Sequence, residues 1–294
     1  MKIIPGPASL ELSEKIARLA NIEKIGVSHR TFPDGESYIR LMGDVQDEHA
    51  VIVQTTCAPQ DTRLMQLGFI ASAAKRNGAQ KVTAVVPYLA YARQDKAFLQ
   101  GENISIETIS GMLKTAGIDD LITINIHSEN ALRFFPFPTK NLSAISLLAE
   151  YFVEKGFQKA FALAPDKGAM YIAEQAQKIL GGDAGHLEKR RDRYTGQTIQ
   201  SVSNLDIKGE VVIIFDDIIS TGGTIVGAAK ILRDLGAAKI FASCVHPLLI
   251  GDAEKRMLDA GVAEIVGTDS VPSNTSQVTL APMIARELQA LESG

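Results

Sequence analysis

The stretch VVIIFDDIISTGGT, residues 211–224, constrains the fold of this chain more than any other part of its sequence. Residues 211–215 form an apolar run, rich in β-branched side chains and short enough for a buried parallel strand. Two aspartates at 216–217 follow, where we expect that strand to end, and small residues fill 220–224. Residues 225–232 have the pattern of the first turns of a helix. Together these segments predict an anion site, because backbone N–H groups and the helix dipole would face one point.

An ordinary strand-to-helix turn with capping hydroxyls is the simpler alternative for this loop. It does not account for Asp216 and Asp217, whose charges would repel a bound anion unless ribose hydroxyls or a magnesium ion bridged them. The loop contains neither Gly-Lys-Ser/Thr nor G-x-G-x-x-G, so it is neither a Walker A loop nor a dinucleotide fingerprint. An acid pair followed by T-G-G-T resembles the phosphoribosyl diphosphate signature of the type I phosphoribosyltransferase fold.

Two parts of the chain are similar to each other. Residues 78–84, GAQKVTA, match residues 236–242, GAAKIFA, at an offset of 158 residues. A helix pattern precedes each copy, and a β-branched strand pattern precedes each helix, at 51–53 and at 211–214. In the first copy Gln-Thr-Thr at 54–56 stands in place of Phe-Asp-Asp, and no Gly-Gly follows. We therefore predict two similar domains, of which only the second keeps the phosphate loop.

Strand and helix patterns alternate along the whole chain, which predicts an α/β protein with parallel sheets. Its 294 residues are enough for two domains. We expect the boundary just after the proline-rich segment at 134–138. The predicted domains are residues 1–143 and 144–281, and the C-terminal helix 282–294 is a candidate to pack on the first of them.

Composition narrows the class of protein. A net charge of −4 gives no basic footprint, so nucleic acid is not expected as the main partner. Cys57 and Cys244, two thiols in apolar surroundings, favour a reducing cytosol over a disulfide framework. The N-terminal apolar run is too short for a signal peptide, and no run approaches the roughly 18 residues that span a membrane. We expect a soluble cytoplasmic protein.

Five further polar segments are candidates for a site. The turn at 30–36 is favoured as a surface hairpin, whereas residues 88–96 are dense in hydrogen-bonding groups where an α/β sheet presents its ligands. Residues 127–129 follow a strand, and 165–168 form a strand-end acid and glycine turn for which a structural and a functional role are equally favoured. Four cations within residues 187–193 fit either a solvated face or a mobile basic flap over a polyphosphate.

Six of these motifs occur together in one known family. The motifs are FPDGE at 32–36, PYLAYARQDK at 87–96, INIHSE at 124–129, APDKG at 164–168, EKRR at 188–191 and DDIISTGGT at 216–224. In this order they resemble the ribose-phosphate pyrophosphokinase family, the phosphoribosyl diphosphate synthetases, and the archaeal branch of it most of all. The resemblance covers essentially the whole chain.

The resemblance implies a fold and a reaction. The fold would be two tandem type I phosphoribosyltransferase-like domains, each with a central, mainly parallel sheet flanked by helices. The reaction would move the diphosphoryl group of Mg-ATP to the anomeric hydroxyl of ribose 5-phosphate, giving 5-phosphoribosyl diphosphate and AMP. Mg²⁺ would be the cofactor. The protein would be a homo-oligomer, a dimer or larger, with its active site near a subunit interface.

The same resemblance assigns roles to individual residues. ATP would be bound by Phe32, Asp34, Gly35, Glu36, Arg93, Gln94 and Asp95. Ribose 5-phosphate would be bound by Arg191, Asp216, Asp217, Ser220, Thr221, Gly222, Gly223 and Thr224. Lys189 and Arg191 match the catalytic flap, and His127 and Asp166 match the magnesium positions. Because Mg²⁺ prefers oxygen ligands, we expect His127 to act at least partly on phosphate.

Two other functions stay open. A type I phosphoribosyltransferase that consumes phosphoribosyl diphosphate would share the loop, but it would not need FPDGE, YARQDK or a second sheet. A non-catalytic associated subunit would bind without turnover. Altered residues at Lys189, Arg191, Asp216 or Asp217 would favour that reading, and all four are intact.

Overall fold

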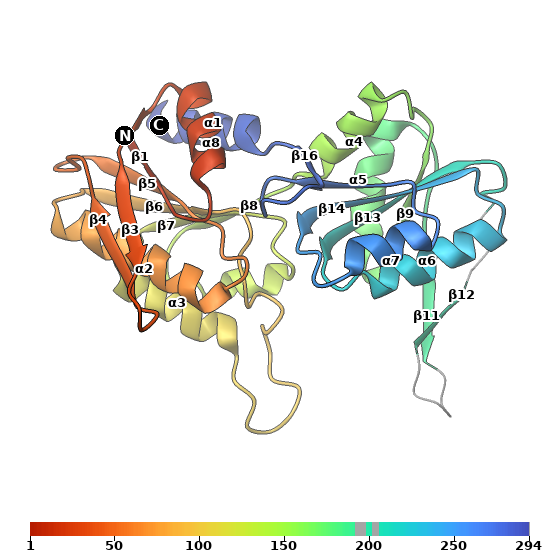
Figure 1. The fold of residues 1–294 in the computed structure, drawn as a ribbon, viewed down its shortest axis with the longest axis horizontal. Helices are drawn as coiled ribbons and strands as arrows, with labels where there is room; N and C mark the ends of the chain where they lie inside the picture. The colour runs from red at the N-terminus through yellow and green to blue at the C-terminus, as the bar shows by residue number, and fades with distance from the viewer. Residues whose placement is uncertain (192–197, 202–205, 294) are drawn as a thin grey trace. The chain divides into compact units, whose positions relative to one another are not determined.

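The computed structural model describes residues 1–191, 198–201 and 206–293, without the side chains of residues 189–191, 198–201 and 293 (Figure 1). The chain divides into two compact units. Unit 1 comprises Met1–Leu142 together with the residues from Thr279 onward, and unit 2 is Ser143–Val278. Each unit is built around its own parallel sheet.

The sheet of unit 1 has six strands in the described residues, in the order β2-β1-β5-β6-β7-β8, with every neighbouring pair parallel. Their bounds are β1 Lys2–Pro5, β2 Glu23–Lys24, β5 His49–Val53, β6 Lys81–Val86, β7 Asp120–Ile124 and β8 Thr139–Leu142. The central strands are buried on both faces, which explains their continuous apolar runs. The parallel arrangement places all their carboxyl ends at one edge.

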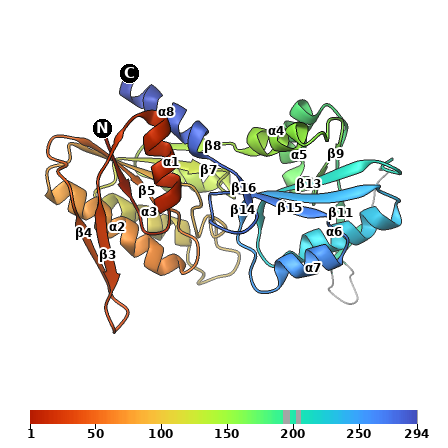
Figure 2. The same cartoon turned by 45° about the horizontal axis from the view of Figure 1, so that its top comes forward.

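Helices cover both faces of this sheet. Helices α2 (Gln60–Arg76) and α3 (Ser105–Thr115) cover one face, while α1 (Leu10–Ala20) and α8 (Ala281–Ser293) lie side by side on the other (Figures 1 and 2). Leu12 and Ile16 of α1 are buried, as are Ile284 and Leu288 of α8. Helix α8 is therefore part of the core of unit 1, although most of that unit lies far before it in the sequence.

An antiparallel ribbon follows strand β2. It consists of β3 (Val27–Thr31) and β4 (Ser37–Leu41). Successive residues of a strand point to opposite faces, so Val27, Ile39 and Leu41 pack against the core while the alternate positions stay outside. The hairpin expected around residues 30–36 is confirmed.

The sheet of unit 2 repeats the first. Its strand order in the described residues is β10-β9-β13-β14-β15-β16, again parallel throughout. The bounds are β9 Phe161–Ala164, β10 Ala184–His186, β13 Val211–Ile219, β14 Lys239–Pro247, β15 Glu264–Thr268 and β16 Ser276–Val278. An antiparallel ribbon follows the edge strand β10 here as well, formed by β11 (Glu188–Arg191) and β12 (Thr198–Ser201).

Helices flank both faces of the second sheet, with α4 (Ile145–Glu154) and α5 (Met170–Leu180) on one face and α6 (Gly223–Asp234) and α7 (Ala253–Asp259) on the other (Figure 1). Short 3₁₀ turns, η1 (Glu129–Phe134) and η2 (Lys167–Ala169), follow β7 and β9. The rings of Phe152, Phe215 and Phe241 meet inside this unit, with centroids 6.2 Å and 5.3 Å from Phe152.

The predicted α/β class with two mainly parallel sheets is confirmed, but two details are corrected. Strand β13 does not end before the aspartates; it runs on to Ile219, because its partner β14 continues alongside to Pro247. The alignment of the two copies also shifts by one residue. Val53 pairs with β6 at the position where Phe215 pairs with β14, so Gln54 corresponds to Asp216, not to Phe215. Thr55 then corresponds to Asp217.

No helix among the described residues combines the length and apolarity that crossing a lipid bilayer requires.

Candidate active site

The acid pair lies in the second half of β13, as the sixth and seventh of its nine residues. Asp216 pairs with Cys244 of β14, so the backbone of the pair is fixed by the sheet. The N–H of Asp217 donates to Oδ1 of Asp216 at 3.0 Å, and the N–H of Ile218 donates to Oδ1 of Asp217 at 2.8 Å. Asp217 is buried and Asp216 is half-buried. The two carboxylates are thus held rigidly at the carboxyl edge of the sheet.

Burial makes these acids electrostatically costly. The pKa of Asp216 is raised well above its ordinary value, first by desolvation and then by the adjacent carboxylate of Asp217. The charge of Asp166 contributes last and least to this rise in the pKa of Asp216. Burial also raises the pKa of the neighbouring Cys244 thiol, so it is inert as a nucleophile. Carboxylate oxygens gathered at one strand end are groups that a cation or sugar hydroxyl donors can bind.

The glycine loop connects β13 to α6. Gly222 is the N-cap of α6 and has a φ of 74°, a left-handed conformation that favours glycine. A Cβ atom there would lie 3.2 Å from the Cγ and Sδ atoms of Met257, so the position also has little room for a side chain. The carbonyl of Thr221 accepts a hydrogen bond from Arg256, and that of Ser220 accepts one from the N–H of Ile250 at 3.0 Å. The loop is therefore tied down from outside.

The loop geometry suits a phosphate. Residues 220–224 end at the N-terminus of a twelve-residue helix, where the first N–H groups lack helical partners. Thr221 and Gly223 are exposed, and Ser220 and Thr224 are partly exposed. The predicted ribose-phosphate residues 216–217 and 220–224 are thus brought together by one strand, one loop and one helix.

Asp166 caps the turn after β9. Its carboxylate accepts from the N–H of Ala169 at 3.2 Å, and its side chain stays partly exposed. The sequence favoured a structural and a functional role for this acid equally. The hydrogen bond to Ala169 shows that it has the structural role. Its effect on Asp216 shows that it also contributes to the field of the acid pair.

The basic motif EKRR forms β11. Lys189 pairs in register with Gln200, and Arg191 with Thr198, in an antiparallel ribbon. The side chains of Lys189 and Arg191 lie outside the described part of the chain. The ribbon starts two residues after β10, which runs parallel to β9, so it leaves the sheet at the same edge as Asp166.

In unit 1 the FPDGE motif forms the turn of the β3–β4 ribbon. The N–H of Phe32 donates to the carbonyl of Glu36 at 2.8 Å, and that of Gly35 to the carbonyl of Phe32 at 2.9 Å. Asp34 accepts from the N–H of Glu36 at 3.1 Å, and Gly35 has a φ of 97°. All four predicted nucleotide residues of this turn are exposed on one tight loop.

Asp95 connects two of the predicted motifs. Its carboxylate accepts from Ser128 Oγ at 2.7 Å and from Asn130 Nδ2 at 3.0 Å, and these bonds lower its pKa. The YARQD segment is thereby fixed to the segment after β7, in which His127 is exposed. The partner Asn130 was missed by the sequence analysis, because nothing local links residues 35 positions apart.

Arg93 and Gln94 are both exposed just before Asp95. Gln94 accepts a hydrogen bond from the hydroxyl of Ser105 at the start of α3. Gln94 is thus oriented by α3, and Ser105 is a second supporting residue that the sequence analysis missed.

No cluster of three His, Cys, Asp or Glu side chains suited to holding a metal ion occurs within the described residues. Asp216, Asp217 and Asp166 nevertheless supply the carboxylate oxygens that Mg²⁺ prefers. An ion that keeps several waters and takes the rest of its ligands from substrate phosphates is compatible with such a partial set.

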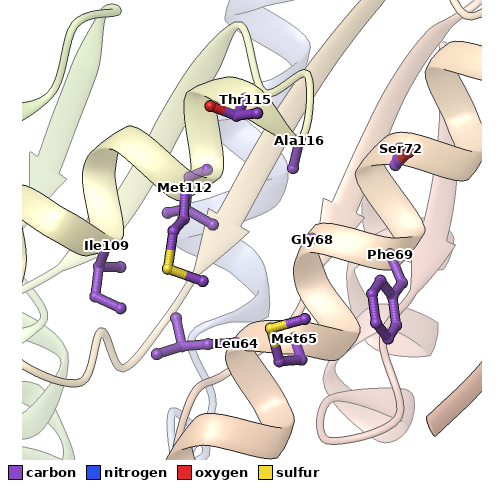
Figure 3. Close-up of a pocket in the computed structure, with 10 residues that line it drawn as sticks. Leu64, Met65, Gly68, Phe69, Ser72, Ile109, Met112, Thr115 and Ala116 are labelled. Atoms are coloured by element: carbon purple, nitrogen blue, oxygen red, sulfur yellow. The ribbon is translucent and has the colours of Figure 1, made fainter.

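A cavity of about 380 Å³ lies between α2 and α3, apart from these motifs (Figure 3). Met65 and Phe69 of α2 face Ile109 and Met112 of α3 around it. Its lining has no charged side chain, so it offers nothing to a phosphate.

Known proteins are similar to this chain over most of its length. The N-terminal domain of ribose phosphate pyrophosphokinase matches residues 1–117, and a phosphoribosyl synthetase-associated domain matches residues 199–285. The ribose-phosphate pyrophosphokinase of Methanobrevibacter smithii is 41% identical over 297 residues, covering 98% of this chain and 99% of that protein. That of Saccharolobus solfataricus is 39% identical, covering 95% and 96%.

A solved structure is similar over the same length. The phosphoribosylpyrophosphate synthetase of Mycobacterium smegmatis superposes with a TM-score of 0.89 at 30% identity, covering 100% of this chain and 99% of that one. Both sheets, both ribbons and the acid-pair loop therefore lie within the matched length. Similarity of this extent shows that the chain belongs to the ribose-phosphate pyrophosphokinase family.

Proposed function

We propose that this chain transfers the diphosphoryl group of ATP to the anomeric hydroxyl of ribose 5-phosphate. The observation that carries the proposal is the match over the full length of both units to proteins named for this activity. The order of the six motifs and the anion site at the start of α6 support it.

Unit 2 would bind the acceptor. The N–H groups at the start of α6 and the hydroxyls of residues 220–224 would hold the 5-phosphate, as helix N-termini do for anions. Asp216 and Asp217 would accept hydrogen bonds from the 2- and 3-hydroxyls of the ribose. These hydroxyls would donate to carboxylates that the sheet already holds in place, so little ordering cost would remain.

Unit 1 would bind the nucleotide. The exposed turn with Phe32, Asp34, Gly35 and Glu36 would contact the base, with Phe32 supplying a stacking surface. Arg93, Gln94 and Asp95 would contact the rest of the nucleotide from the loop that Ser128 fixes.

Magnesium would be the cofactor, held by Asp166, by the acid pair and by substrate oxygens, with His127 acting at least partly on phosphate. When bound, it would neutralise charge on the phosphates of ATP and so aid their displacement. A bound cation would also relieve the repulsion that raises the pKa of Asp216.

The chemistry asks for positioning and charge rather than for a strong base. The anomeric oxygen forms a bond to the β-phosphorus, the bond from that phosphorus to the α–β bridging oxygen breaks, and the hydroxyl proton leaves to solvent. Negative charge develops on the bridging oxygen of AMP. Lys189 and Arg191 on the β11–β12 ribbon would stabilise it, and the ribbon would exclude water that could otherwise hydrolyse ATP.

One assay separates this function from its alternatives. The chain is incubated with ATP, MgCl₂ and ribose 5-phosphate, and AMP and phosphoribosyl diphosphate are quantified by ion-exchange chromatography. We expect both products in equal amounts. Release of diphosphate from phosphoribosyl diphosphate and a nucleobase, without AMP formation from ATP, would instead identify a phosphoribosyltransferase. No turnover in either assay would identify an associated subunit.

We further propose that the active protein is a cytoplasmic homo-oligomer whose site lies near a subunit interface. The two described thiols, Cys57 and Cys244, are free, as a reducing compartment favours. If subunits share sites, a Glu36→Ala chain mixed with an Asp217→Ala chain would regain activity that neither has alone. Mixed oligomers without recovered activity would overturn the shared site.

A further inference from the structure

Three side chains form a cluster on the outer face of the β3–β4 ribbon. The guanidinium carbon of Arg30 lies 4.8 Å from the ring centroid of Phe32 and 4.7 Å from that of Tyr38. The two rings meet edge to face, with centroids 6.1 Å apart. One cation thus covers two aromatic rings, an arrangement that contributes attraction to both.

The ribbon register produces this cluster. Arg30 and Tyr38 are directly opposite each other in the antiparallel pair, and Phe32 lies two residues beyond Arg30 on the same face. The opposite face carries Val27 and Ile39, which pack against the core of unit 1. The core therefore holds the ribbon but does not hold the ring of Phe32.

Phe32 keeps 37% of its surface exposed although it is a large aromatic side chain. Arg30 occupies one face of the ring, so a base that stacks on Phe32 takes the opposite face. A freely rotating ring would lose more rotamer freedom on stacking than one that is already held. The cluster is thus suited to holding the ring in one orientation before the nucleotide arrives.

We propose that Arg30 is a positioning residue for the nucleotide, which acts by clamping Phe32 against Tyr38. This inference rests on the proposed function, because it takes Phe32 as the stacking surface for the base. A planar guanidinium can stack on an aromatic face, whereas the compact ammonium of lysine cannot do so equally well.

The test compares Arg30→Ala, Arg30→Lys, Phe32→Ala and the Arg30→Ala/Phe32→Ala double variant. KM and kcat are measured for ATP and for ribose 5-phosphate, and ATP binding is measured separately by calorimetry without ribose 5-phosphate. Arg40→Ala is the matched control, because Arg40 is exposed on the same face of the same ribbon and contacts neither ring in the described structure. Thermal unfolding checks that each variant is folded.

We expect Arg30→Ala to raise KM for ATP about tenfold, with kcat and KM for ribose 5-phosphate within about twofold of the parent values. Arg30→Lys should recover only part of the loss. In the Phe32→Ala background the Arg30 change should have almost no further effect, since a residue that acts through another cannot act after that one is removed.

Three outcomes would contradict the proposal that Arg30 clamps Phe32. Arg30→Ala could leave KM for ATP as unchanged as Arg40→Ala does, or its effect on KM could multiply with that of Phe32→Ala. Arg30→Lys could also restore ATP affinity fully, with a strong salt dependence. The last result would make Arg30 a direct phosphate contact. A failure of the proposed function would look different, because the parent protein itself would then form no AMP. The proposed role of Arg30 would be contradicted in that case too.

Discussion

Strands β5 and β13 occupy the same place in the two sheets, but the side chains at the corresponding positions differ in charge. Gln54 and Thr55 follow β5 at the positions that Asp216 and Asp217 hold in β13. Gln54 is completely buried; its Oε1 accepts from the N–H of Ala8 at 3.0 Å. Thr55 donates its N–H to the hydroxyl of Ser9 at 2.8 Å. Every one of these contacts lies within unit 1.

The acid pair of unit 2 accepts local backbone bonds, from the N–H of Asp217 to Asp216 and from the N–H of Ile218 to Asp217. Its carboxylates repel each other and are desolvated, which is why the pKa of Asp216 is raised. The comparison shows that neutral polar side chains fill this strand end in unit 1, whereas unit 2 places two acids there at an electrostatic cost. Unit 1 has used the equivalent groups to hold its own N-terminal segment.

The ribbons make a second contrast. Ribbon β3–β4 follows edge strand β2, and ribbon β11–β12 follows the corresponding edge strand β10. The first carries the proposed adenine turn and the second carries the proposed catalytic cations. If these proposals hold, the same insertion point serves binding in one unit and the chemical step in the other.

The largest effect should come from giving unit 2 the residues of unit 1. We expect the Asp216→Gln/Asp217→Thr chain to lose turnover by about a thousandfold, roughly 4 kcal/mol, because both sugar contacts and the cation site disappear. AMP formation measures the loss, and circular dichroism checks the fold. Asp234→Asn, an exposed acid at the end of α6, is the control. A double variant that keeps a tenth of its activity would remove the pair from the site.

Variants of the β11–β12 ribbon should lower kcat, the rate of the chemical step. Lys189→Ala and Arg191→Ala should each lower kcat about a hundredfold, near 3 kcal/mol, because a cation that meets charge developing on the leaving oxygen acts only in the transition state. Steady-state rates with both substrates varied give the answer, with exposed Lys208→Ala as the matched control. Near-normal kcat with weakened ribose 5-phosphate binding would contradict the catalytic role.

Gln54→Ala should lower the stability of the fold without changing the binding of ribose 5-phosphate. Removing this buried amide leaves the N–H of Ala8 unpaired and opens a cavity, so the free energy of unfolding should fall by about 2 kcal/mol. Urea unfolding measures it, and Gln100→Ala on an exposed loop is the control. The KM for ribose 5-phosphate should not change. A tenfold rise in that KM at unchanged stability would mean that the strand ends are functionally alike.

The smallest effect concerns pH. Asp216→Asn should raise the free energy of unfolding near neutral pH by roughly 1 kcal/mol, the usual size of a single stabilising change. Because the folded-state pKa is raised, the folded protein holds a proton more tightly than the unfolded chain, so the parent loses stability as pH rises from about 4 towards the raised value. The variant should lack this loss. Parallel stability curves for the two proteins between pH 4 and 7 would contradict the buried-acid account.

The sequence predicted the main strands and helices because their apolar runs are periodic and bounded by glycine or proline. It missed the edge strands β2 and β8, whose residues are mostly charged or polar and which pair on one side only. It ended β13 too early because two charges look like a strand end. The ladder with β14 extends the strand, and that partner is distant in sequence.

For the candidate site, the sequence predicted the motifs but not the hydrogen-bond partners that hold them in place. The acids 216–217 and the loop 220–224 are contiguous, so local pattern was enough. The bond from Asn130 to Asp95 and the bond from Ser105 to Gln94 join separate motifs through the fold. The roles assigned to individual residues, and the domain limits at 143 and 281, stay predictions.

The position of helix α8 affects the order in which the two units can fold during synthesis. Because unit 2 interrupts unit 1 in the sequence, the ribosome delivers α8 only after all of unit 2 has been made. Until then α1 can pack on β1 and β2 but lacks its contacts with α8. The second unit can complete its fold during synthesis while the first, although begun earlier, waits for its final piece.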